Sequence, residues 1–401
     1  MKKQARRGVL NLMAGIARAI VSKYRPIIVG ITGSVGKTTT QAAVVAVLRE
    51  AFPVMTNDTH ATSEWGVLAA ILAPGDHSFY RTGKSGWTEI TAAGIFRLMF
   101  LGMTKVVFAV KYPKLFVLEM GIDHPGDMAF FNSFLKLDVA VVTNVGTAHR
   151  EFFGSKEDLI SEKISIFRGL KKNGLAILGE DQEEVRRLVE KEINPVRLLT
   201  ISGQKIEVKL PDGRQWPPAA AVAEQVGAEF ALTDEQIESG ISKLSPIPGR
   251  FEANRLNRGI VLVDDSYNSS LSAVRLGMEG LSDLGAGRKV AILGGMRELG
   301  AVHNEAHTSV GEGAAKTVDL LITLGADGKL IADGARKAGM ASDKIIELVW
   351  SDGDTNTRAV VDTILGILQD NDKVLIKASR SVGLAKLAHD LTFAIGFDHA
   401  Q

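Results

Sequence analysis

A glycine-rich loop constrains the fold of this chain more than any other feature of its sequence. Residues 30–40 read GITGSVGKTTT; an apolar, β-branched run precedes them, and an alanine-rich apolar run follows from Ala42 to Leu48. This order predicts a strand, a loop and a helix. Glycines lack Cβ, so backbone N–H groups can approach an anion, and the helix points the positive end of its dipole at the same place. The loop is therefore expected to bind the phosphates of a nucleotide.

Two side chains of the loop carry the expected chemistry. Lys37 can reach the β- and γ-phosphates, and the hydroxyl of Thr38 can ligate Mg²⁺. The spacing G-x-x-G-x-x-G-K-T departs from the strict Walker pattern because Ile31 occupies the position of a small residue. A glycine turn that binds nothing is the alternative, and Gly-Lys-Thr-Thr at the start of a helix argues against it. The expected phosphate contacts are Gly33, Ser34, Val35, Gly36, Lys37, Thr38 and Thr39.

Composition excludes several classes of protein. The 401 residues are enough for two or three domains. A formal net charge of +1 gives no global reason to expect nucleic-acid binding. The chain contains no cysteine, which excludes disulfides and thiolate metal sites. No segment has the uncharged length of a membrane-spanning helix, so we expect a globular, cytoplasmic protein.

Two apolar segments suggest a membrane or partner surface. Residues 1–25 carry several lysines and arginines but no acid, and their apolar positions fall at helical spacing, which predicts a basic amphipathic helix. Such a helix docks on the nucleotide-binding core or lies on the inner face of a membrane. Residues 92–110 are strongly apolar but are interrupted by Arg97 and Lys105. We expect a buried or partner-facing helix there, with membrane contact as the alternative.

Apolar strands alternate with helices in two successive sections of the chain. The expected strands of the first section are 114–121, 138–144 and 174–178, with an amphipathic helix from Lys156 to about Leu170. The turn-rich run 245–250 ends that section. The expected strands of the second section are 260–264, 289–293, 319–323, 344–348 and 373–377.

This alternation predicts the α/β fold class. We expect a central P-loop ATPase domain with a mainly parallel sheet and a C-terminal doubly wound, Rossmann-like domain. The expected boundaries are 1–25 for the basic helix, 26–249 for the central domain and 250–401 for the C-terminal domain.

Three polar residues of the first section are candidates for one metal–nucleotide site. Glu119 ends a strand, where parallel sheets hold their ligands, and it can ligate Mg²⁺. His149 follows the next strand, and Lys163 lies on the helix after it. Each alone has a simpler explanation, as a loop cap, a polar loop residue or a solvated lysine. Their joint occurrence after a glycine loop favours the shared site.

The second section has two polar strand ends. Asp264 and Asp265 close a strand just before Tyr267, so carboxylates could bind ribose hydroxyls and the tyrosine could pack against a base. A helix cap is the alternative. Lys377, Ser379 and Arg380 follow the last strand, where they offer cations and hydroxyls to the same edge of the sheet, or form an ordinary strand-to-helix loop.

Several runs, together with the glycine loop, occur in the order found in a known family. They are SEWGV (63–67), LEMGIDHPGDM (118–128), VVTNVGTAHREFFGS (141–155), PGRFE (248–252), VDDSYNSS (263–270), LGGMRELG (293–300) and KASRS (377–381). On these runs the chain resembles the Mur ligase family, ATP-dependent enzymes that join an amino acid or dipeptide to a carboxylate. It is most similar to the members that add D-alanyl-D-alanine during peptidoglycan synthesis.

The resemblance implies roles for individual residues. Lys37 and Thr38 would bind phosphate and Mg²⁺, Glu119 would ligate the metal, and His149 would ligate a second Mg²⁺. Lys163 falls where the family has a lysine that reacts with CO₂ to form a carbamate, which is a carboxylate-like ligand for Mg²⁺. The implied nucleotide contacts in the second section are Arg250, Asp265, Tyr267 and Asn268. We expect Asn144, Lys377, Ser379 and Arg380 to contact the other substrates.

The chain departs from the family at its start. Family members usually begin with a separate domain that binds the uridine diphosphate of the substrate, whereas only residues 1–25 precede the first strand here. The resemblance therefore predicts a chain without that domain, and a partner that supplies it is one expectation. A further departure is Ser165, where the family has a glutamate two residues after the carbamate lysine.

The expected function is an ATP-dependent acid–amine ligase that works through an acyl phosphate. One alternative is a Mur-like ligase that acts on a polyglutamate, a cofactor acid or a lipid-linked precursor. Another is a non-catalytic, nucleotide-binding partner subunit at the membrane surface. The expected cofactors are ATP and two Mg²⁺ ions, with a CO₂-derived carbamate on Lys163, and the expected substrates are small molecules or peptide precursors.

Overall fold

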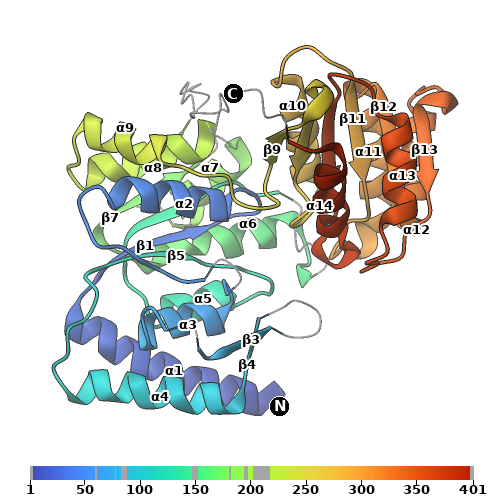
Figure 1. The fold of residues 1–401 in the computed structure, drawn as a ribbon. Helices are drawn as coiled ribbons and strands as arrows, with labels where there is room; N and C mark the ends of the chain where they lie inside the picture. Colours follow the sequence, from blue (N-terminus) through green and yellow to red (C-terminus); the bar gives the residue numbers. More distant parts are fainter. Residues whose placement is uncertain are drawn as a thin grey trace. The chain divides into compact units, whose positions relative to one another are not determined.

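The computed structural model describes residues 3–58, 61–76, 78–82, 88–146, 152–179, 182–193, 197–201 and 217–397. They divide into two compact units: apart from Gly146, which groups with the second unit, the first unit runs to Leu244 and the second runs from Ser245. Each unit has its own six-stranded sheet with helices on both faces (Figure 1). The α/β class predicted from the sequence is confirmed.

The first unit is built on a parallel sheet with the order β2-β5-β1-β6-β7-β8. Its strands are β1 (Ile27–Thr32), β2 (Met55–Thr56), β5 (Leu115–Glu119), β6 (Leu137–Val142), β7 (Leu170–Leu178) and β8 (Leu198–Thr200). The central strands β1, β5 and β6 are almost wholly buried, as their continuous apolar runs require. The carboxyl ends of these three strands meet at one edge, where the glycine loop begins.

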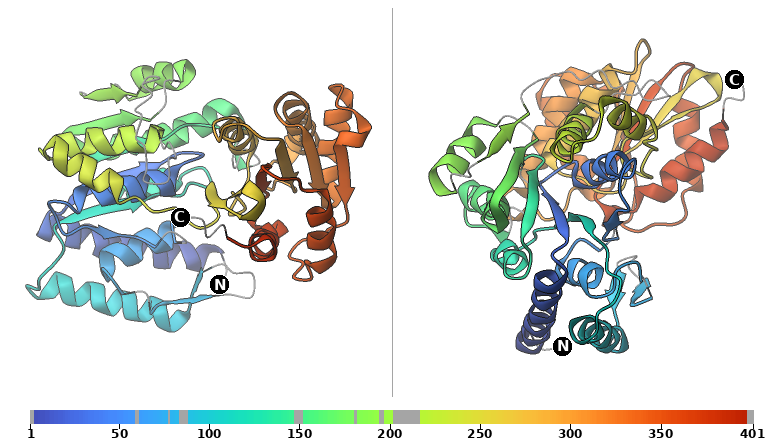
Figure 2. Two further views of the ribbon diagram at one scale, coloured as in Figure 1. Left: turned by 45° about the horizontal axis from the view of Figure 1, so that its top comes forward. Right: turned by 90° about the vertical axis from the view of Figure 1, so that its left-hand side faces the viewer.

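Helices cover both faces of this sheet (Figure 1). One face carries α2, which packs against α8 and α9. The other face carries α3 and α5, with α1 and α4 as an outer layer (Figures 1 and 2). The helices of the unit are α1 (Lys3–Tyr24), α2 (Lys37–Leu48), α3 (Glu64–Leu72), α4 (Ala92–Val107), α5 (Asp127–Asn132), α6 (Lys156–Ile164), α7 (Glu183–Glu192), α8 (Pro217–Glu229) and α9 (Asp234–Ser242).

The basic N-terminal helix α1 packs into the first unit. Its apolar residues Leu10, Met13, Ala17 and Ile20 belong to the hydrophobic core. At its end, the Lys23 ammonium donates hydrogen bonds to the carbonyls of Lys105 and Val106 in the last turn of α4 and to that of Phe108, the C-cap residue. The cation thereby satisfies acceptors that a helix C-terminus leaves open. The structure thus shows α1 docked on the core of the first unit, which is the first of the two arrangements expected from the sequence.

The second unit has the sheet order β13-β12-β11-β14-β10-β9. All its strands run parallel except the edge strand β9. The strands are β9 (Glu252–Arg255), β10 (Val261–Asp264), β11 (Lys289–Leu293), β12 (Leu320–Leu324), β13 (Ile345–Leu348) and β14 (Lys373–Lys377). Helices α10 (Leu271–Ser282), α11 (His303–Thr317) and α12 (Gly325–Lys337) share one core cluster, and α13 (Arg358–Ile367) and α14 (Leu384–Ile395) share the other. The unit is therefore doubly wound.

The structure corrects the sequence analysis in a few places. The helix expected from Lys156 to about Leu170 ends at Ile164, and a 3₁₀ turn covers Ser165–Gly169. The Ser165 hydroxyl donates to the carbonyl oxygen of Glu162, and the Asn132 amide donates to that of Ser165, so side chains take over acceptors of the helix. The polar edge strand β9 and the antiparallel pair β3 (Tyr80–Thr82) and β4 (Thr88–Ile90) were not expected.

Among the described helices, none is long and apolar enough to span a membrane.

Close packing of α11 on α12 supports a stability prediction. A Cβ on Gly311 would overlap the carbonyl oxygen of Ile331, whereas a Cβ on Gly313 would make an ordinary contact with Met278. We expect Gly311→Ala to destabilise the second unit by about 1–3 kcal/mol, because the backbones of α11 and α12 must separate. Gly313→Ala should leave stability unchanged or raise it by up to about 1 kcal/mol, since alanine favours a helix. Urea midpoints measured by circular dichroism compare the two variants, and equal midpoints would contradict the prediction.

Candidate active site

The glycine loop is anchored to the end of β6. The N–H groups of Ser34 and Val35 donate to the backbone and side-chain oxygens of Asn144, each at 3.0 Å, and the Thr143 hydroxyl donates to the Val35 carbonyl at 2.7 Å. Gly33 has φ 149°, and a Cβ there would overlap the Thr143 hydroxyl, so only glycine fits. Asn144, expected as a substrate contact, therefore has a visible role in holding the loop.

The start of α2 supplies the groups for an anion. Gly36 is the N-cap residue in a left-handed conformation, and Lys37, Thr38 and Thr39 form the first turn. The first N–H groups of a helix have no partner within it, so these backbone donors and the helix dipole favour a phosphate. Since the N–H groups of Ser34 and Val35 are already bonded to Asn144, the first turn is the better candidate for direct phosphate contacts.

Two lysines converge on one carbonyl of the loop. The Gly33 carbonyl accepts from Lys37 Nζ at 3.0 Å and from Lys163 Nζ at 3.3 Å. Lys163 is only 1% exposed. Burial, together with the nearby Lys37 cation, lowers the pKa of Lys163 to about 7. Near neutral pH a large fraction of this amine is therefore uncharged and nucleophilic.

An oxygen pair lies beside the lysines. The Thr38 hydroxyl donates to a carboxylate oxygen of Glu119 at 2.8 Å, and both side chains are buried. Hydroxyl and carboxylate oxygens are the ligands that Mg²⁺ prefers, so this pair fits the ion. The structure thus brings together Lys37 and Thr38 of α2, Glu119 of β5 and Lys163 of α6.

Asn57 and Gln41 hold Glu119 in place, and the sequence analysis missed both. Asn57 exchanges two hydrogen bonds with the backbone of Glu119, each of 2.9 Å. Gln41 donates to the Asn57 side-chain oxygen at 3.0 Å and to the Val117 carbonyl at 3.0 Å. Their signal in the sequence is weak: Gln41 is a polar residue one turn after Lys37, and Asn57 opens a polar stretch after β2.

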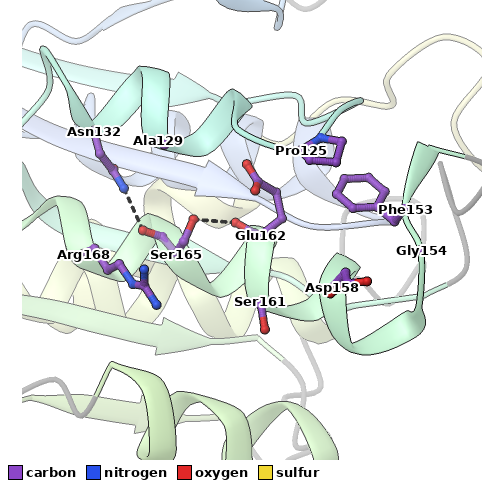
Figure 3. A pocket seen from close by; sticks show the side chains of 10 residues that line it. All are labelled: Pro125, Ala129, Asn132, Phe153, Gly154, Asp158, Ser161, Glu162, Ser165 and Arg168. Atoms are coloured by element: carbon purple, nitrogen blue, oxygen red, sulfur yellow. Dashed lines mark hydrogen bonds between the residues drawn. The ribbon is translucent and has the colours of Figure 1, made fainter.

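The loop after β5 is fixed by α6. The Glu162 carboxylate accepts from the N–H groups of Gly126 and Met128, and the His124 ring lies 4.5 Å from that of Phe152. Beside it is a hollow of about 400 Å³ between α5 and α6 (Figure 3). Its lining mixes the apolar rings of Pro125 and Phe153 with polar side chains. His149, predicted to bind a second metal ion, lies outside the described residues.

A second cluster occupies the carboxyl edge of β10 and β14 in the second unit. Lys377 is 2% exposed, and its ammonium donates to the Asp265 carboxylate at 2.6 Å and to the Asn268 carbonyl at 2.9 Å. The guanidinium carbon of Arg250 lies 4.0 Å from the centre of the Tyr267 ring, and that of Arg380 lies 5.3 Å away. The predicted residues Arg250, Asp265, Tyr267, Asn268, Lys377 and Arg380 therefore form one cluster.

A further polar group of the second unit was missed by the sequence analysis. A hollow of about 530 Å³ beyond the carboxyl ends of β11 and β12 is lined in part by Arg297, His303 and Asp327. Arg297 pairs with Asp327 and Asp352, His303 bonds Asp327 at 3.0 Å, and the predicted residue Ser379 accepts from the Arg297 N–H at 2.9 Å.

The group beyond β11 and β12 does not fit a metal ion, although His307 lies close to it. One ring nitrogen of His307 accepts from the N–H of Met296 at 2.9 Å, and the other is 2.7 Å from the His303 carbonyl, to which it donates. Burial also lowers the pKa of His307, so its ring is neutral with both nitrogens used. Asp327, which is bonded to His303, therefore holds the Arg297 side chain, and His307 fixes the backbone at Met296 and His303.

The fold and the loop define a nucleotide-binding α/β protein with a P-loop in its first unit. The family model for the Mur ligase middle domain matches residues 31–255, and the model for the Mur ligase, glutamate ligase domain, matches residues 249–380. The chain therefore belongs to the Mur ligase family. This confirms the resemblance inferred from the sequence, and the chain is an ATP-dependent ligase of that family.

Individual relatives agree with this assignment. The UDP-N-acetylmuramoyl-tripeptide–D-alanyl-D-alanine ligase of Bacillus subtilis is 25% identical over 95% of this chain and 79% of the relative. The Escherichia coli ligase of the same name is 26% identical over 84% of this chain and 76% of the relative. Among solved structures, MurF ligase from Thermotoga maritima in complex with ADP has a TM-score of 0.73, with 23% identity over 96% of this chain and 84% of that one. Folylpolyglutamate synthase of Mycobacterium tuberculosis, complexed with ADP and AMPPCP, has a TM-score of 0.62, with 13% identity over 96% of both chains.

Proposed function

We propose that this ligase joins D-alanyl-D-alanine to the terminal carboxylate of a UDP-linked muramoyl tripeptide. The observation that carries the proposal is the convergence of Lys37, Lys163 and the Thr38–Glu119 oxygen pair on one glycine loop. Such a site is suited to transferring a phosphoryl group from ATP to a carboxylate. The choice of substrates follows the curated relatives, which carry this activity in their names.

The reaction would proceed in two steps. An oxygen of the substrate carboxylate attacks the γ-phosphorus, the bond to the bridging oxygen breaks, and ADP leaves. The amine nitrogen then attacks the acyl carbon and loses a proton as phosphate departs, which forms the amide. Lys37 and the N-terminus of α2 offset the charge on the transferred group. Thr38 and Glu119 would hold Mg²⁺, which supplies a Lewis acid when bound, and His149 remains a predicted ligand of a second ion.

We further propose that Lys163 carries a carbamate. A neutral lysine nitrogen attacks the carbon of CO₂ and loses a proton, and the product is an anion with two oxygens. The lowered pKa of the Lys163 amine makes its uncharged form available, and its position beside the glycine loop would place those oxygens near the Thr38–Glu119 pair. The modification would turn a buried cation into an additional oxygen ligand for Mg²⁺.

Roles in the second unit remain predictions. We propose Arg250, Asp265, Tyr267 and Asn268 as nucleotide contacts, since two guanidinium groups lie close to the Tyr267 ring and offer positive charge to a phosphate. Lys377 is already bonded to Asp265 and Asn268, so a positioning role suits it better than direct substrate contact. Ser379 holds the backbone of Arg297, and Arg380 remains a candidate for binding substrate.

The hydroxyl of Thr38 permits a test of the proposed metal site. Thr38→Val removes the hydroxyl oxygen but keeps the shape of the side chain. The Mg²⁺ concentration that gives half of the maximal rate should rise about tenfold or more, because a buried oxygen ligand that is hydrogen-bonded to a carboxylate is lost. Thr38→Ser keeps the hydroxyl and should stay within about threefold of the unsubstituted enzyme. Mg²⁺ titrations of ADP release distinguish the variants. An unchanged Mg²⁺ requirement in Thr38→Val would remove Thr38 from the metal site.

The proposed reaction is tested by ADP release with ATP, Mg²⁺ and bicarbonate present. Release that requires both the UDP-linked tripeptide and D-alanyl-D-alanine supports the proposal. If this pair gives no ADP release but another acid–amine pair does, the result would favour a Mur-like ligase with other substrates. The other acids to be tried include a polyglutamate, a cofactor acid and a lipid-linked precursor. Tight ATP binding with no release for any pair would favour a non-catalytic subunit.

The chain covers 79% of the Bacillus subtilis ligase, and the family models that match it are those of the middle domain and the glutamate ligase domain. We propose that a second polypeptide supplies uridine recognition. We place the reaction in the cytoplasm, where ATP and nucleotide-linked precursors are available, with peripheral contact at the inner face of the membrane. Addition of a purified uridine-binding partner should lower the KM for the UDP-linked substrate and leave the KM for ATP unchanged.

A further inference from the structure

An exposed apolar stripe follows the outer side of α4. Its residues are Phe96, Phe100, Met103 and Val107, whose exposed fractions are 79%, 64%, 45% and 64%. They recur at intervals of four, three and four residues, so they share one face of the helix. Four large apolar side chains on one helix face form a contiguous patch, which on a soluble protein marks an interaction site. We call this set the α4 stripe.

The α4 stripe sits on a firmly held helix. On the inner side Gly94, Leu98 and Gly102 are buried, and a Cβ on Gly102 would press against Leu72 of α3 and Ile16 of α1. Lys23 of α1 holds the last carbonyls of α4, as described above. In Figures 1 and 2, α1 and α4 lie side by side as the outer layer of the first unit. The stripe is therefore presented on a rigid surface and is not a frayed segment.

The charge of the outer layer formed by α1 and α4 indicates which kind of partner fits the stripe. Helix α1 carries Arg6, Arg7, Arg18 and Lys23, helix α4 carries Arg97 and Lys105, and neither helix contains an acid. The described ion pairs of the layer bring in two carboxylates, Glu64 with Arg6 and Asp76 with Arg97, which leaves a surplus of positive charge. A second copy of the chain would bring like charges together at this face. An anionic lipid surface complements both the cations and the aromatic side chains.

We propose that the α4 stripe and the cations of α1 and α4 dock the enzyme on a bilayer that contains anionic lipids. The helix lies parallel to the surface and inserts the stripe at the level of the headgroups, in keeping with the finding that no described helix can span a membrane. The α1 helix does not insert, because its apolar face is buried in the core, and contributes charge instead. This docking is independent of which acid and amine the active site joins.

Vesicle sedimentation tests the proposal with the full chain. Vesicles of phosphatidylcholine with about a third phosphatidylglycerol should bind the protein, whereas pure phosphatidylcholine should bind it at least tenfold more weakly because the electrostatic attraction is lost. The double variant Phe96→Ser and Phe100→Ser should lower binding to the anionic vesicles by at least tenfold. The matched control is Phe393→Ser, since Phe393 is 83% exposed on α14 of the second unit and should not affect binding.

A second measurement guards against misfolding of the double variant. Phe100→Trp keeps an aromatic side chain and should show a blue shift of tryptophan emission when anionic vesicles are added. The double variant should retain the ATP affinity of the unsubstituted protein, because the stripe lies outside the glycine loop. Equal binding to neutral and anionic vesicles, unchanged binding of the double variant, no emission shift, or a concentration-dependent dimer that the double variant abolishes would each overturn the proposal.

Discussion

Lys37→Ala is expected to lower the rate of ADP formation by about 10³-fold or more, because single cationic contacts to a transferred phosphoryl group contribute effects of that size. The Lys37 ammonium lies 3.0 Å from the Gly33 carbonyl at the start of α2, and the lysine of such a loop can turn from that carbonyl to the phosphates of ATP. Alanine leaves the helix N-terminus intact but removes the mobile positive charge. The decrease in rate should therefore appear mainly in kcat.

Single-turnover measurements of ADP formation, combined with calorimetric titration of ATP, separate the effect of Lys37→Ala on the chemical step from its effect on ATP binding. ATP binding should weaken by much less than the rate, since the N–H groups of the first turn of α2 remain. Lys316→Ala, an exposed lysine on α11 of the second unit, is the control for the loss of a surface charge and should retain the full rate. Undiminished turnover in Lys37→Ala would exclude the loop as the site of phosphoryl transfer.

The location of the first-unit site could be predicted from the sequence because the chemistry of parallel sheets is local. Lys37 follows one apolar strand and Glu119 ends its neighbour, and the carboxyl ends of neighbouring parallel strands meet at one edge. The doubly wound second unit followed from the alternation of apolar strands with helices in the same way. These inferences require only the period of the hydrophobic pattern and the positions where strands end.

Other parts of the site could not be found from pattern alone. The contact between Lys163 and Gly33 joins residues 130 positions apart, and periodicity gives no distance across such a separation. Asn57 and Gln41 hold Glu119 through hydrogen bonds whose partners are backbone atoms of β5. In the second unit the network of Arg297, His303 and Asp327 joins two successive βα segments. Only the folded chain shows such pairings.

The two apolar segments near the N-terminus illustrate a related limit. Helical periodicity identified an apolar face in residues 1–25 and a strongly apolar run in residues 92–110, but it does not say what covers either one. The structure buries the apolar face of α1 in the core and leaves Phe96 and Phe100 of α4 exposed. Burial depends on which elements pack together, which is set by the whole fold and not by one segment.

On the proposal that Lys163 carries a carbamate, Lys163→Ala is expected to reduce activity by at least about 10²-fold, since the variant would lose an oxygen ligand of the Mg²⁺ that stabilises the transferred group. If the ligand is a carbamate, acetate or propionate can enter the space left by the lysine side chain and restore part of the rate. Lys163→Arg leaves no such space and keeps a fixed cation, so the acids should not rescue it. Lys156→Ala on the same helix removes an exposed lysine paired with Glu184 and should stay active.

The pH dependence of carbamate formation gives a second, independent readout. The pKa of Lys163 is lowered to about 7, so its proton is lost as the pH rises through 7, and the proposed attack on CO₂ requires the uncharged amine. Enzyme stripped of CO₂ should therefore regain activity faster at pH 8 than at pH 6 when the dissolved CO₂ concentration is held constant, with the midpoint near pH 7. ¹³C-labelled CO₂ should give a carbamate signal that is absent in Lys163→Ala. Full activity of Lys163→Ala, or reactivation independent of pH, would contradict a carbamate at this position, and Lys163 would then act as a buried amine beside the phosphate loop.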